Sequence, residues 1–335
     1  MIAGANPFTR VVEAPIAGYP PTMVSLGYFL SCEEFRPREL VRQAKLAADA
    51  GFERLWISDH FHPWNDEQGQ SPFVWSVIGA LSEAVDLPIT TAVTCPTVRT
   101  HPAVIAQAAA TAAVQHEGRF VLGVGSGEAL NEHILGDPWP AADVRLEMLE
   151  EAVEVIRKLH QGGVVNHRGR HYTVEGARIY TLPDEPVPIY VSGFGPKATD
   201  LAGRIGDGFV CVLPDADLVK RFRDAGGGSK PAQGGFKVCY ADSDEEGLAT
   251  AHRLWPNTLV PGELAQVLPQ PRHFEQASSL VTKEMMAGTL PTGPDPEAYQ
   301  ETLQSYVDAG YDEVYVAQMG PRQDEFFDFW RTKVR

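Results

Sequence analysis

The stretch LWISDHFHPW at residues 55–64 joins a short apolar run to a dense group of polar, titratable and aromatic side chains. We predict that Leu55–Ile57 is a buried strand, so Asp59, His60 and His62 follow directly at its carboxyl end. In an α/β barrel this end of each strand carries the chemistry, whereas a plain loop is rich in Gly, Asn and Ser. The stretch therefore indicates a functional strand end in a parallel α/β fold.

Outward from this stretch, short apolar runs alternate with longer helical patterns along the chain. We predict strands at Val24–Phe29, Leu55–Ile57, Ile89–Thr94, Phe120–Val124, Ile189–Ser192, Phe209–Leu213, Phe236–Tyr240 and Val314–Ala317. Helices are predicted at residues 37–50, 72–85, 102–115, 142–160, 196–205, 216–224, 243–253, 296–309 and 323–333. Strands that are apolar throughout are typical of a parallel sheet buried on both faces.

Eight such strands with following helices favour an α/β fold of the (β/α)8 TIM-barrel type with insertions. A doubly wound dinucleotide-binding sheet would need G-x-G-x-x-G after the first strand, and residues 30–34 contain no glycine. We expect a single barrel domain over residues 1–335. Residues 1–22 form a predicted N-terminal arm, and the Pro-rich residues 255–293 a predicted insertion near the active-site mouth. A hairpin is expected at Val164–Tyr180.

The net charge of −16 argues against nucleic acid as a partner, because phosphate binding needs a basic surface. The chain has no apolar run near the roughly 18 residues of a membrane span, and no secretory signal pattern at its start. We therefore expect a cytoplasmic protein that acts on a small molecule. The four cysteines have no C-x-x-C pair and are predicted to be buried free thiols: Cys32, Cys95, Cys211 and Cys239.

His60 beside Asp59 is a candidate general acid or base, because an imidazole titrates near neutral pH. The alternative is a barrel-end histidine that bonds only to backbone. Asp59 and Glu128 are also residue types that cap helices, and His62 is left open between a substrate contact and an exposed side chain. Trp64 suits a stacking wall for a ligand, with a core position as the alternative. Residue type alone permits a metal site at His60, His62 and Glu128, although we expect none.

Two glycine-rich loops follow the fourth and fifth predicted strands, at Gly125–Asn131 and Ser192–Lys197. Glycine lets backbone N–H groups approach a ligand closely, and a helix N-terminus behind the second loop would favour an anion. Barrels often hold phosphate in their later strand–helix loops. Both loops are therefore candidate ligand-binding segments.

Four motifs, in the same order along the chain, now identify a family. They are SDHFHPW (58–64), CPTVRTHPAVIAQ (95–107), GVGSGEALNE (123–132) and AGRIGDGF (202–209). In these motifs the chain resembles the luciferase-like superfamily, and more narrowly the coenzyme F420-dependent glucose-6-phosphate dehydrogenases and their relatives. The similarity is close over about residues 24–212 and looser beyond.

The resemblance implies that the barrel mouth binds coenzyme F420, with the deazaflavin ring deep inside, and that the protein is a homodimer. It implies that His60 exchanges a proton beside the carbon that carries the hydride, while Trp64 and Glu128 line the ring and substrate region. It also implies a non-proline cis peptide at Ala92-Val93. Cofactor contacts are implied for Asp59, Ala92, Val93, Cys95, Ser126, Gly127, Asn131, Gly193, Phe194 and Gly195.

The chain departs from the sugar-phosphate dehydrogenases where their basic side chains clamp the 6-phosphate. The matching positions hold Asp215, approximately Ala265 and approximately Gly288. A carboxylate repels a phosphate at close range, and a phosphate site needs Lys or Arg. We therefore predict an F420-dependent oxidoreductase for an uncharged alcohol, hemiacetal or carbonyl compound.

Three alternatives stay open. One is a sugar-6-phosphate dehydrogenase whose phosphate site is rebuilt by Lys283 or Arg272. The second is an FMN-dependent luciferase-like monooxygenase, and the third a non-catalytic F420-binding protein. Neither the substrate nor the physiological direction of the reaction follows from the sequence.

Overall fold

The computed structural model describes residues 24–335, and the predicted arm at residues 1–22 lies outside this range. Eight parallel strands close into a barrel in the order β1-β10-β9-β8-β7-β4-β3-β2. The strands are β1 (Ser25–Leu30), β2 (Arg54–Ile57), β3 (Ile89–Thr91), β4 (Phe120–Val124), β7 (Ile189–Ser192), β8 (Gly208–Cys211), β9 (Ala232–Val238) and β10 (Glu313–Gln318). The predicted TIM barrel is confirmed.

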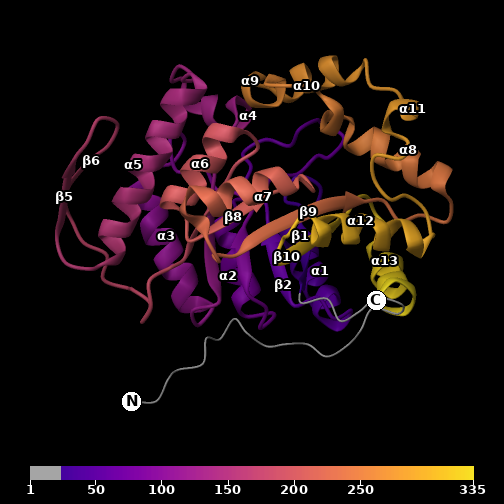
Figure 1. Cartoon of the computed structure of the whole chain (residues 1–335), viewed down its shortest axis with the longest axis horizontal. Helices are drawn as coiled ribbons and strands as arrows, with labels where there is room; N and C mark the ends of the chain where they lie inside the picture. The colour runs from indigo at the N-terminus through magenta and orange to yellow at the C-terminus, as the bar shows by residue number, and fades with distance from the viewer. Residues whose placement is uncertain (1–23) are drawn as a thin grey trace.

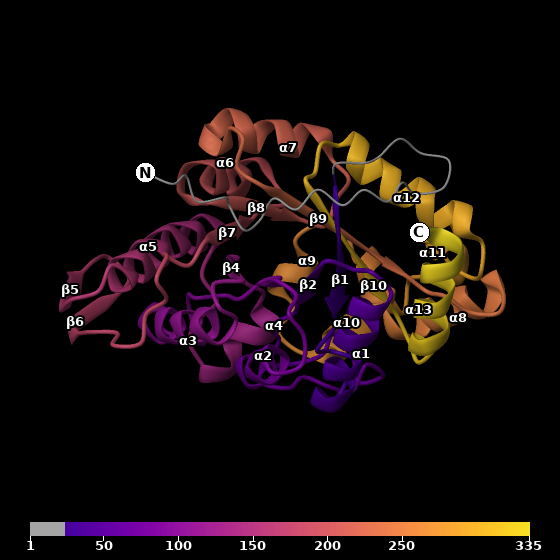
Figure 2. The ribbon, with the colours of Figure 1, turned by 90° about the horizontal axis from the view of Figure 1, so that it is seen from below.

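Helices surround the barrel (Figures 1 and 2). The longer ones are α1 (Pro37–Asp49), α2 (Val74–Ser82), α3 (Pro102–Gln115), α5 (Ala142–His160), α6 (Pro196–Ile205), α7 (Ala216–Phe222), α8 (Asp244–Leu254), α10 (Pro271–Ser278), α12 (Pro296–Asp308) and α13 (Gln323–Phe329). Short helices are α4 (Ala129–Glu132), α9 (Leu264–Val267) and α11 (Lys283–Met286). Within residues 24–335 no helix is long and apolar enough to cross a membrane.

Two additions lie outside the regular strand–helix repeat. The predicted hairpin is present as the antiparallel pair β5 (Val165–Arg168) and β6 (Thr173–Ala177), which projects beyond α5 at one edge of the molecule (Figures 1 and 2). The segment 255–293 carries α9, α10 and α11, and α9 packs against α4. Because α4 follows β4, this segment lies at the end of the barrel where the strands finish.

Two strand boundaries differ from the sequence-based prediction by three residues or more, and several others differ by one or two. β9 begins at Ala232 instead of Phe236, because the paired glycines Gly234 and Gly235 belong to the strand and not to a loop. A Cβ at Gly235 would lie 2.4 Å from the Trp56 ring, so the strand needs glycine there. β3 ends at Thr91 instead of Thr94, directly before the cis peptide bond described below.

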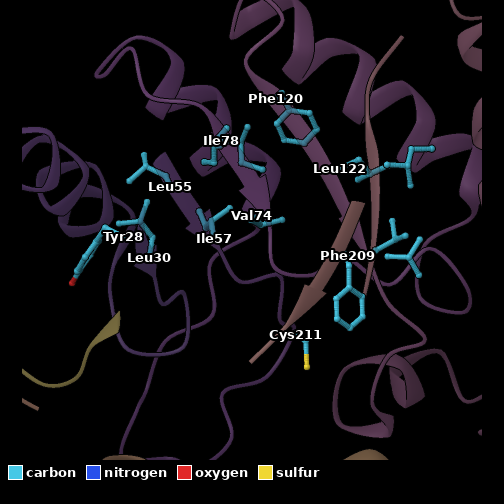
Figure 3. Packing of buried hydrophobic residues seen from close by; sticks show 14 of the residues in the cluster. Tyr28, Leu30, Leu55, Ile57, Val74, Ile78, Phe120, Leu122, Phe209 and Cys211 are labelled. Atoms are coloured by element: carbon cyan, nitrogen blue, oxygen red, sulfur yellow. The ribbon is translucent and has the colours of Figure 1, made fainter. Parts of the chain in front are cut away.

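Side chains fill the barrel interior as a packed layer. The Trp56 ring stacks on Tyr315 with centroids 4.2 Å apart, and its Nε1 donates to Oε1 of Gln233 at 2.8 Å. A larger apolar layer lies between strands and helices, where Leu55, Phe120 and Phe209 are among the fully buried residues (Figure 3). All four cysteines are buried free thiols, as predicted.

The fit of Gly235 against Trp56 gives a stability prediction. We expect Gly235→Ala to lower the free energy of unfolding by about 1–3 kcal/mol, because the added methyl overpacks a filled interior. Urea unfolding followed by tryptophan fluorescence measures it. The control is Gly79→Ala within α2, whose added Cβ would lie at an ordinary contact distance of 3.6 Å from the Gln115 side chain, and which should not lower stability because alanine favours a helix over glycine. Equal effects in the two variants would contradict the close contact.

Candidate active site

A carboxylate after β1 meets the histidine after β2 at the rim of the barrel. Nε2 of His60 lies 3.4 Å from Oε1 of Glu33, and the two side chains are only 10% and 4% exposed. The hydroxyls of Ser58 and Ser31 donate to the other carboxylate oxygen at 2.6 and 2.9 Å. Burial alone would raise the pKa of Glu33, but the charge of His60 and these hydrogen bonds outweigh it and lower that pKa. The carboxylate is thus kept ionised beside the imidazole.

The second imidazole nitrogen, Nδ1 of His60, faces two groups of opposite character. The carbonyl oxygen of His62 lies 3.1 Å from it, and Nδ2 of Asn131 lies 3.2 Å from it. The orientation of Asn131 follows from its Oδ1, which accepts from the backbone N–H groups of Phe61 and His62. A protonated Nδ1 donates to the carbonyl, and an unprotonated Nδ1 accepts from Asn131. This nitrogen therefore has a partner in either protonation state, and a histidine bonded only to backbone is excluded.

Asp59 belongs to a second buried ion pair beside the first. Its two oxygens accept from the Arg99 guanidinium at 2.9 Å and from the Thr94 hydroxyl at 2.8 Å. Arg99 also donates its backbone N–H to Glu132 at 2.6 Å. Burial raises the pKa of Glu132 to about 7, against the opposing effect of Arg99. Asp59 joins the loops after β2 and β3, so its alternative role as a helix cap is wrong.

Trp64 forms a wall beside His60, with ring centroids 5.0 Å apart. Its other neighbour is Phe274 of α10, in an edge-to-face contact at 5.1 Å. Further along the same loop, the backbone N–H of Asp66 donates to the Glu275 carboxylate at 3.0 Å. The loop that carries the histidine is therefore fixed against the segment 255–293.

His62 and Glu128 both connect to α4 in ways that the sequence left open. Nδ1 of His62 lies 2.9 Å from the carbonyl oxygen of Leu130, so this side chain is bound to the structure instead of standing free. Glu128 occupies the N-cap position of α4 without a side-chain capping bond. Its Oε2 lies 3.4 Å from Nδ2 of Asn131, which connects it to His60. In the described part of the chain no three His, Cys, Asp or Glu side chains are arranged to hold a metal ion.

The predicted cofactor residues lie on the loops after β2, β3, β4 and β7. The peptide bond Ala92-Val93 is cis, as the resemblance implied. A Cβ at Gly127 would lie 2.5 Å from Sγ of Cys95, so the loop after β4 can pack this closely against Cys95 only because residue 127 is glycine. Such a cradle of close-packed backbone fits a flat ring held by main-chain groups.

The second glycine loop ends in the expected helix. Gly195 is the N-cap of α6, and a Cβ there would meet nothing within 4 Å. A Cβ at Gly193 would lie 2.8 Å from the backbone nitrogen of Thr199, so the loop folds tightly onto the first turn. Phe194 is half exposed beside it. The open helix N-terminus fits the phosphodiester of a nucleotide-like cofactor tail.

A cavity of about 320 Å³ occupies the other half of the mouth, among β1, β9, β10 and the loop after β8. Residues 258–259 and 289–291 also line the cavity. Three of its residues, Leu259, Leu290 and Met319, belong to the apolar cluster that also contacts Trp64. The cavity therefore shares an apolar cluster with Trp64 of the loop that carries His60.

The residues compared with a phosphate clamp lie elsewhere. Asp215 is the N-cap of α7, where its Oδ1 accepts from the backbone N–H groups of Asp217 and Leu218. Arg272 and Lys283 are exposed on α10 and α11. None of Asp215, Arg272 and Lys283 lines the cavity. The Asp215 side chain is therefore a structural cap, and its charge says less about the substrate than the sequence-based argument assumed.

Glu33, Glu34 and Arg99 are site residues that were not predicted. Glu33 and Glu34 could have been found from the sequence, because two acidic residues follow the first strand at the rim where chemistry is expected. Glu34 accepts from Nε1 of Trp255 at 2.5 Å and from the backbone N–H of Gly320 at 2.8 Å. Arg99 lies within a quoted motif, but its carboxylate partners come from loops 33 and 40 positions away in sequence.

Comparison with known proteins gives the family. The model of the luciferase-like monooxygenase family matches residues 20–313. The F420-dependent glucose-6-phosphate dehydrogenase of Segniliparus rotundus is 36% identical over 323 residues, covering 91% of this chain and 95% of that protein. Its namesake from Rhodococcus erythropolis is 36% identical over 325 residues, covering 92% and 95%. This chain belongs to the luciferase-like monooxygenase family.

The similarity extends to solved structures. An F420-dependent secondary alcohol dehydrogenase, in complex with an F420-acetone adduct, superposes with a TM-score of 0.87 at 30% identity, covering 93% of this chain and 99% of that one. The F420-dependent tetrahydromethanopterin reductase of Methanopyrus kandleri, at 19% identity and a TM-score of 0.74, shares the fold. The resemblance to F420-dependent dehydrogenases is confirmed.

The position of Glu34 predicts a pH dependence of stability. Burial raises its pKa from 4.5 to about 7 in the folded protein. Between these values the folded state binds a proton that the unfolded state has released, so stability falls as the pH rises through this window. We expect Glu34→Gln to lose about 1–2 kcal/mol less stability than the unmutated protein between pH 5 and pH 8.

Urea unfolding at several pH values measures the difference. The variant loses one hydrogen bond, so the comparison concerns the slope with pH and not the absolute stability. Glu301→Gln, an exposed change on α12, is the control and should leave the slope unaltered. Parallel pH curves for Glu34→Gln and the unmutated protein would refute the assignment.

Proposed function

We propose that this protein transfers a hydride between coenzyme F420 and an uncharged alcohol, hemiacetal or carbonyl compound. Its 36% identity with F420-dependent dehydrogenases supports the cofactor and the class of reaction. The observation that carries the uncharged substrate is the cavity among β1, β9 and β10, whose walls are mainly apolar and hold a single lysine. A phosphate dianion would need several charge-assisted donors, and no such cluster lines this cavity.

The mouth divides into two halves that suit two ligands. We assign the cofactor to the half built after β2, β3, β4 and β7, with contacts from Asp59, Ala92, Val93, Cys95, Ser126, Gly127, Asn131, Gly193, Phe194 and Gly195. We assign the substrate to the cavity at β8, β9, β10 and β1. The barrel order makes β1 and β2 neighbours, so Glu33 and His60 stand where the two halves meet.

His60 acts in this proposal as the proton-handling group. F420, when bound, supplies the hydride acceptor or donor. In the oxidation of an alcohol, His60 takes the hydroxyl proton, and in the reduction of a carbonyl it returns one. Nε2 is the atom that exchanges the proton, and the Glu33 carboxylate beside it stabilises the resulting imidazolium. Nδ1 stays protonated and donates to the His62 carbonyl. Trp64 and Glu128 flank the reacting region and exclude water from it.

We also propose that residues 255–293 form part of the single barrel domain and roof the substrate half. The protein is further proposed to work as a cytoplasmic homodimer with a small-molecule substrate and with neither nucleic acid nor membrane as partner. The four buried free thiols fit a reducing compartment. Sedimentation of the purified chain tests the dimer.

A substrate screen tests the proposed function. Purified protein is titrated with F420 by fluorescence and then assayed for F420 reduction with neutral alcohols and for oxidation of reduced F420 with neutral ketones, with glucose 6-phosphate alongside. We expect turnover of neutral compounds at kcat/KM at least about tenfold above that of the sugar phosphate. The reverse order would establish a sugar-phosphate dehydrogenase, and FMN-dependent oxygen consumption without F420 turnover would establish a monooxygenase.

Substitution of His60 tests the mechanism. We expect His60→Gln to lower kcat/KM by about 10²- to 10⁴-fold, the usual contribution of a general acid or base, while the Kd for F420 changes by less than about threefold. His160→Gln is the matched control, because this histidine lies at the far end of α5 and bonds only the Ala106 carbonyl. Unchanged turnover by His60→Gln would remove His60 from the proton-transfer step.

A further inference from the structure

The cavity among β1, β9 and β10 contains few polar side chains, and nearly all of their donors are used. The hydroxyls of Thr258, Thr289 and Thr302 donate to the backbone carbonyls of Trp255, Met286 and Ala298 at 2.7–2.9 Å. The Tyr306 hydroxyl lies 2.7 and 3.0 Å from two further backbone carbonyls. These side chains are therefore occupied as donors within the protein.

Lys237 is the exception among the residues that line this cavity. It projects from β9, and its Nζ lies 4.3 Å from the centroid of the Trp255 ring. Within residues 24–335 its ammonium makes no hydrogen bond and no ion pair at contact distance. Burial lowers the pKa of Lys237, against the opposing charges of Glu33 and Glu34. A partly buried ammonium with free donors is costly unless a ligand supplies an acceptor.

The surrounding charges decide what kind of acceptor fits. The charge of Glu33, which is kept ionised, and that of Glu34 in its ionised form act on the Lys237 ammonium. An anionic ligand group would gain from one cation but be repelled by the Glu33 carboxylate. A neutral acceptor oxygen gains the hydrogen bond without that repulsion. The charge balance thus favours an ether, ester or carbonyl oxygen over a carboxylate or phosphate.

The rest of the cavity limits the substrate further. Its volume of about 320 Å³ is at the small end of ligand sites. The walls beyond Lys237 are largely apolar and include Phe29, Phe236, Leu259, Leu290 and Met319. A sugar would leave several hydroxyls without partners there, each at a cost in free energy.

We propose that Lys237 determines specificity, and that the substrate is a small, mainly apolar secondary alcohol or ketone that presents one additional neutral acceptor oxygen to the Lys237 ammonium. The reacting oxygen faces His60 and the second oxygen faces Lys237, so two polar anchors orient an otherwise apolar molecule. This inference rests on the proposed function and adds the substrate class to it.

The test compares matched substrates in the F420-coupled assay. One is a methyl ketone that carries a methoxy group, and its twin has a methylene in place of the ether oxygen. A third has a carboxylate at the same position. We expect the unmutated enzyme to favour the ether over its hydrocarbon twin by about tenfold or more in kcat/KM, as for a hydrogen bond to a charged group. The keto acid should be the poorest of the three.

Substitutions of Lys237 then show whether this side chain causes the preference for the ether. Lys237→Met should bring the ether-to-twin ratio close to one, and Lys237→Gln, which keeps a neutral donor, should give an intermediate ratio. Lys220→Met, an exposed change on α7, is the control and should keep the original ratio. F420 titration and thermal melting verify that each variant is folded and binds the cofactor.

Three results would overturn the inference. An unchanged ratio in Lys237→Met would show that Lys237 does not contact the substrate, while leaving F420-dependent turnover intact. A preference for the keto acid that disappears with Lys237→Met would make this an anion site. Failure of the unmutated enzyme to turn over any neutral compound, while it still binds F420, would refute the proposed function and this inference with it.

Discussion

Closure of the parallel sheet is the constraint on which the rest of the molecule depends. β1 hydrogen-bonds to β2 on one edge and to β10 on the other, so all eight strands finish at one rim. A shift of one residue would turn Trp56, Gln233 and Tyr315 out of the interior that they fill. In the observed register Leu30 lies opposite Ile57, and the loops that follow these residues bring Glu33 to His60.

Charge at this rim is arranged as balanced groups. Glu33 faces His60, and Asp59 faces Arg99. Glu34 accepts two hydrogen bonds close to Lys237. Such pairing limits the desolvation cost of each buried ion. It also means that the mouth presents no concentrated positive field, in keeping with the acidic net charge of the whole chain. An anion would find individual cations here, each already opposed by a carboxylate.

The sequence predicts the barrel well because its strands are apolar on both faces and its helices have clear periodicity. Residues 102–115 and 120–124 were placed with the boundaries that the structure has. The start of β9 was predicted wrongly because a long-range contact determines it: Gly235 belongs to the strand, where Trp56 packs against it. In the site, His60, Trp64 and Glu128 follow from local chemistry and resemblance. The roles of Glu33, Arg99 and Lys237 could not be predicted in this way, because their partners come from distant parts of the chain that meet only when the barrel closes.

The division of the mouth has a consequence for how such enzymes diversify. The half proposed for the cofactor contains Gly127 and Gly193, where an added Cβ would collide with neighbouring atoms, so most substitutions at these two positions would be harmful. The other half is walled partly by residues 255–293, which contact the loop that carries His60 through Trp64 and Phe274, while the ring nitrogens of His60 have their partners outside this segment. Selection can therefore alter this wall residue by residue without rebuilding the hydride chemistry. Related enzymes can therefore keep one redox centre while they act on different substrates, because the residues that run the reaction are separate from those that select the substrate.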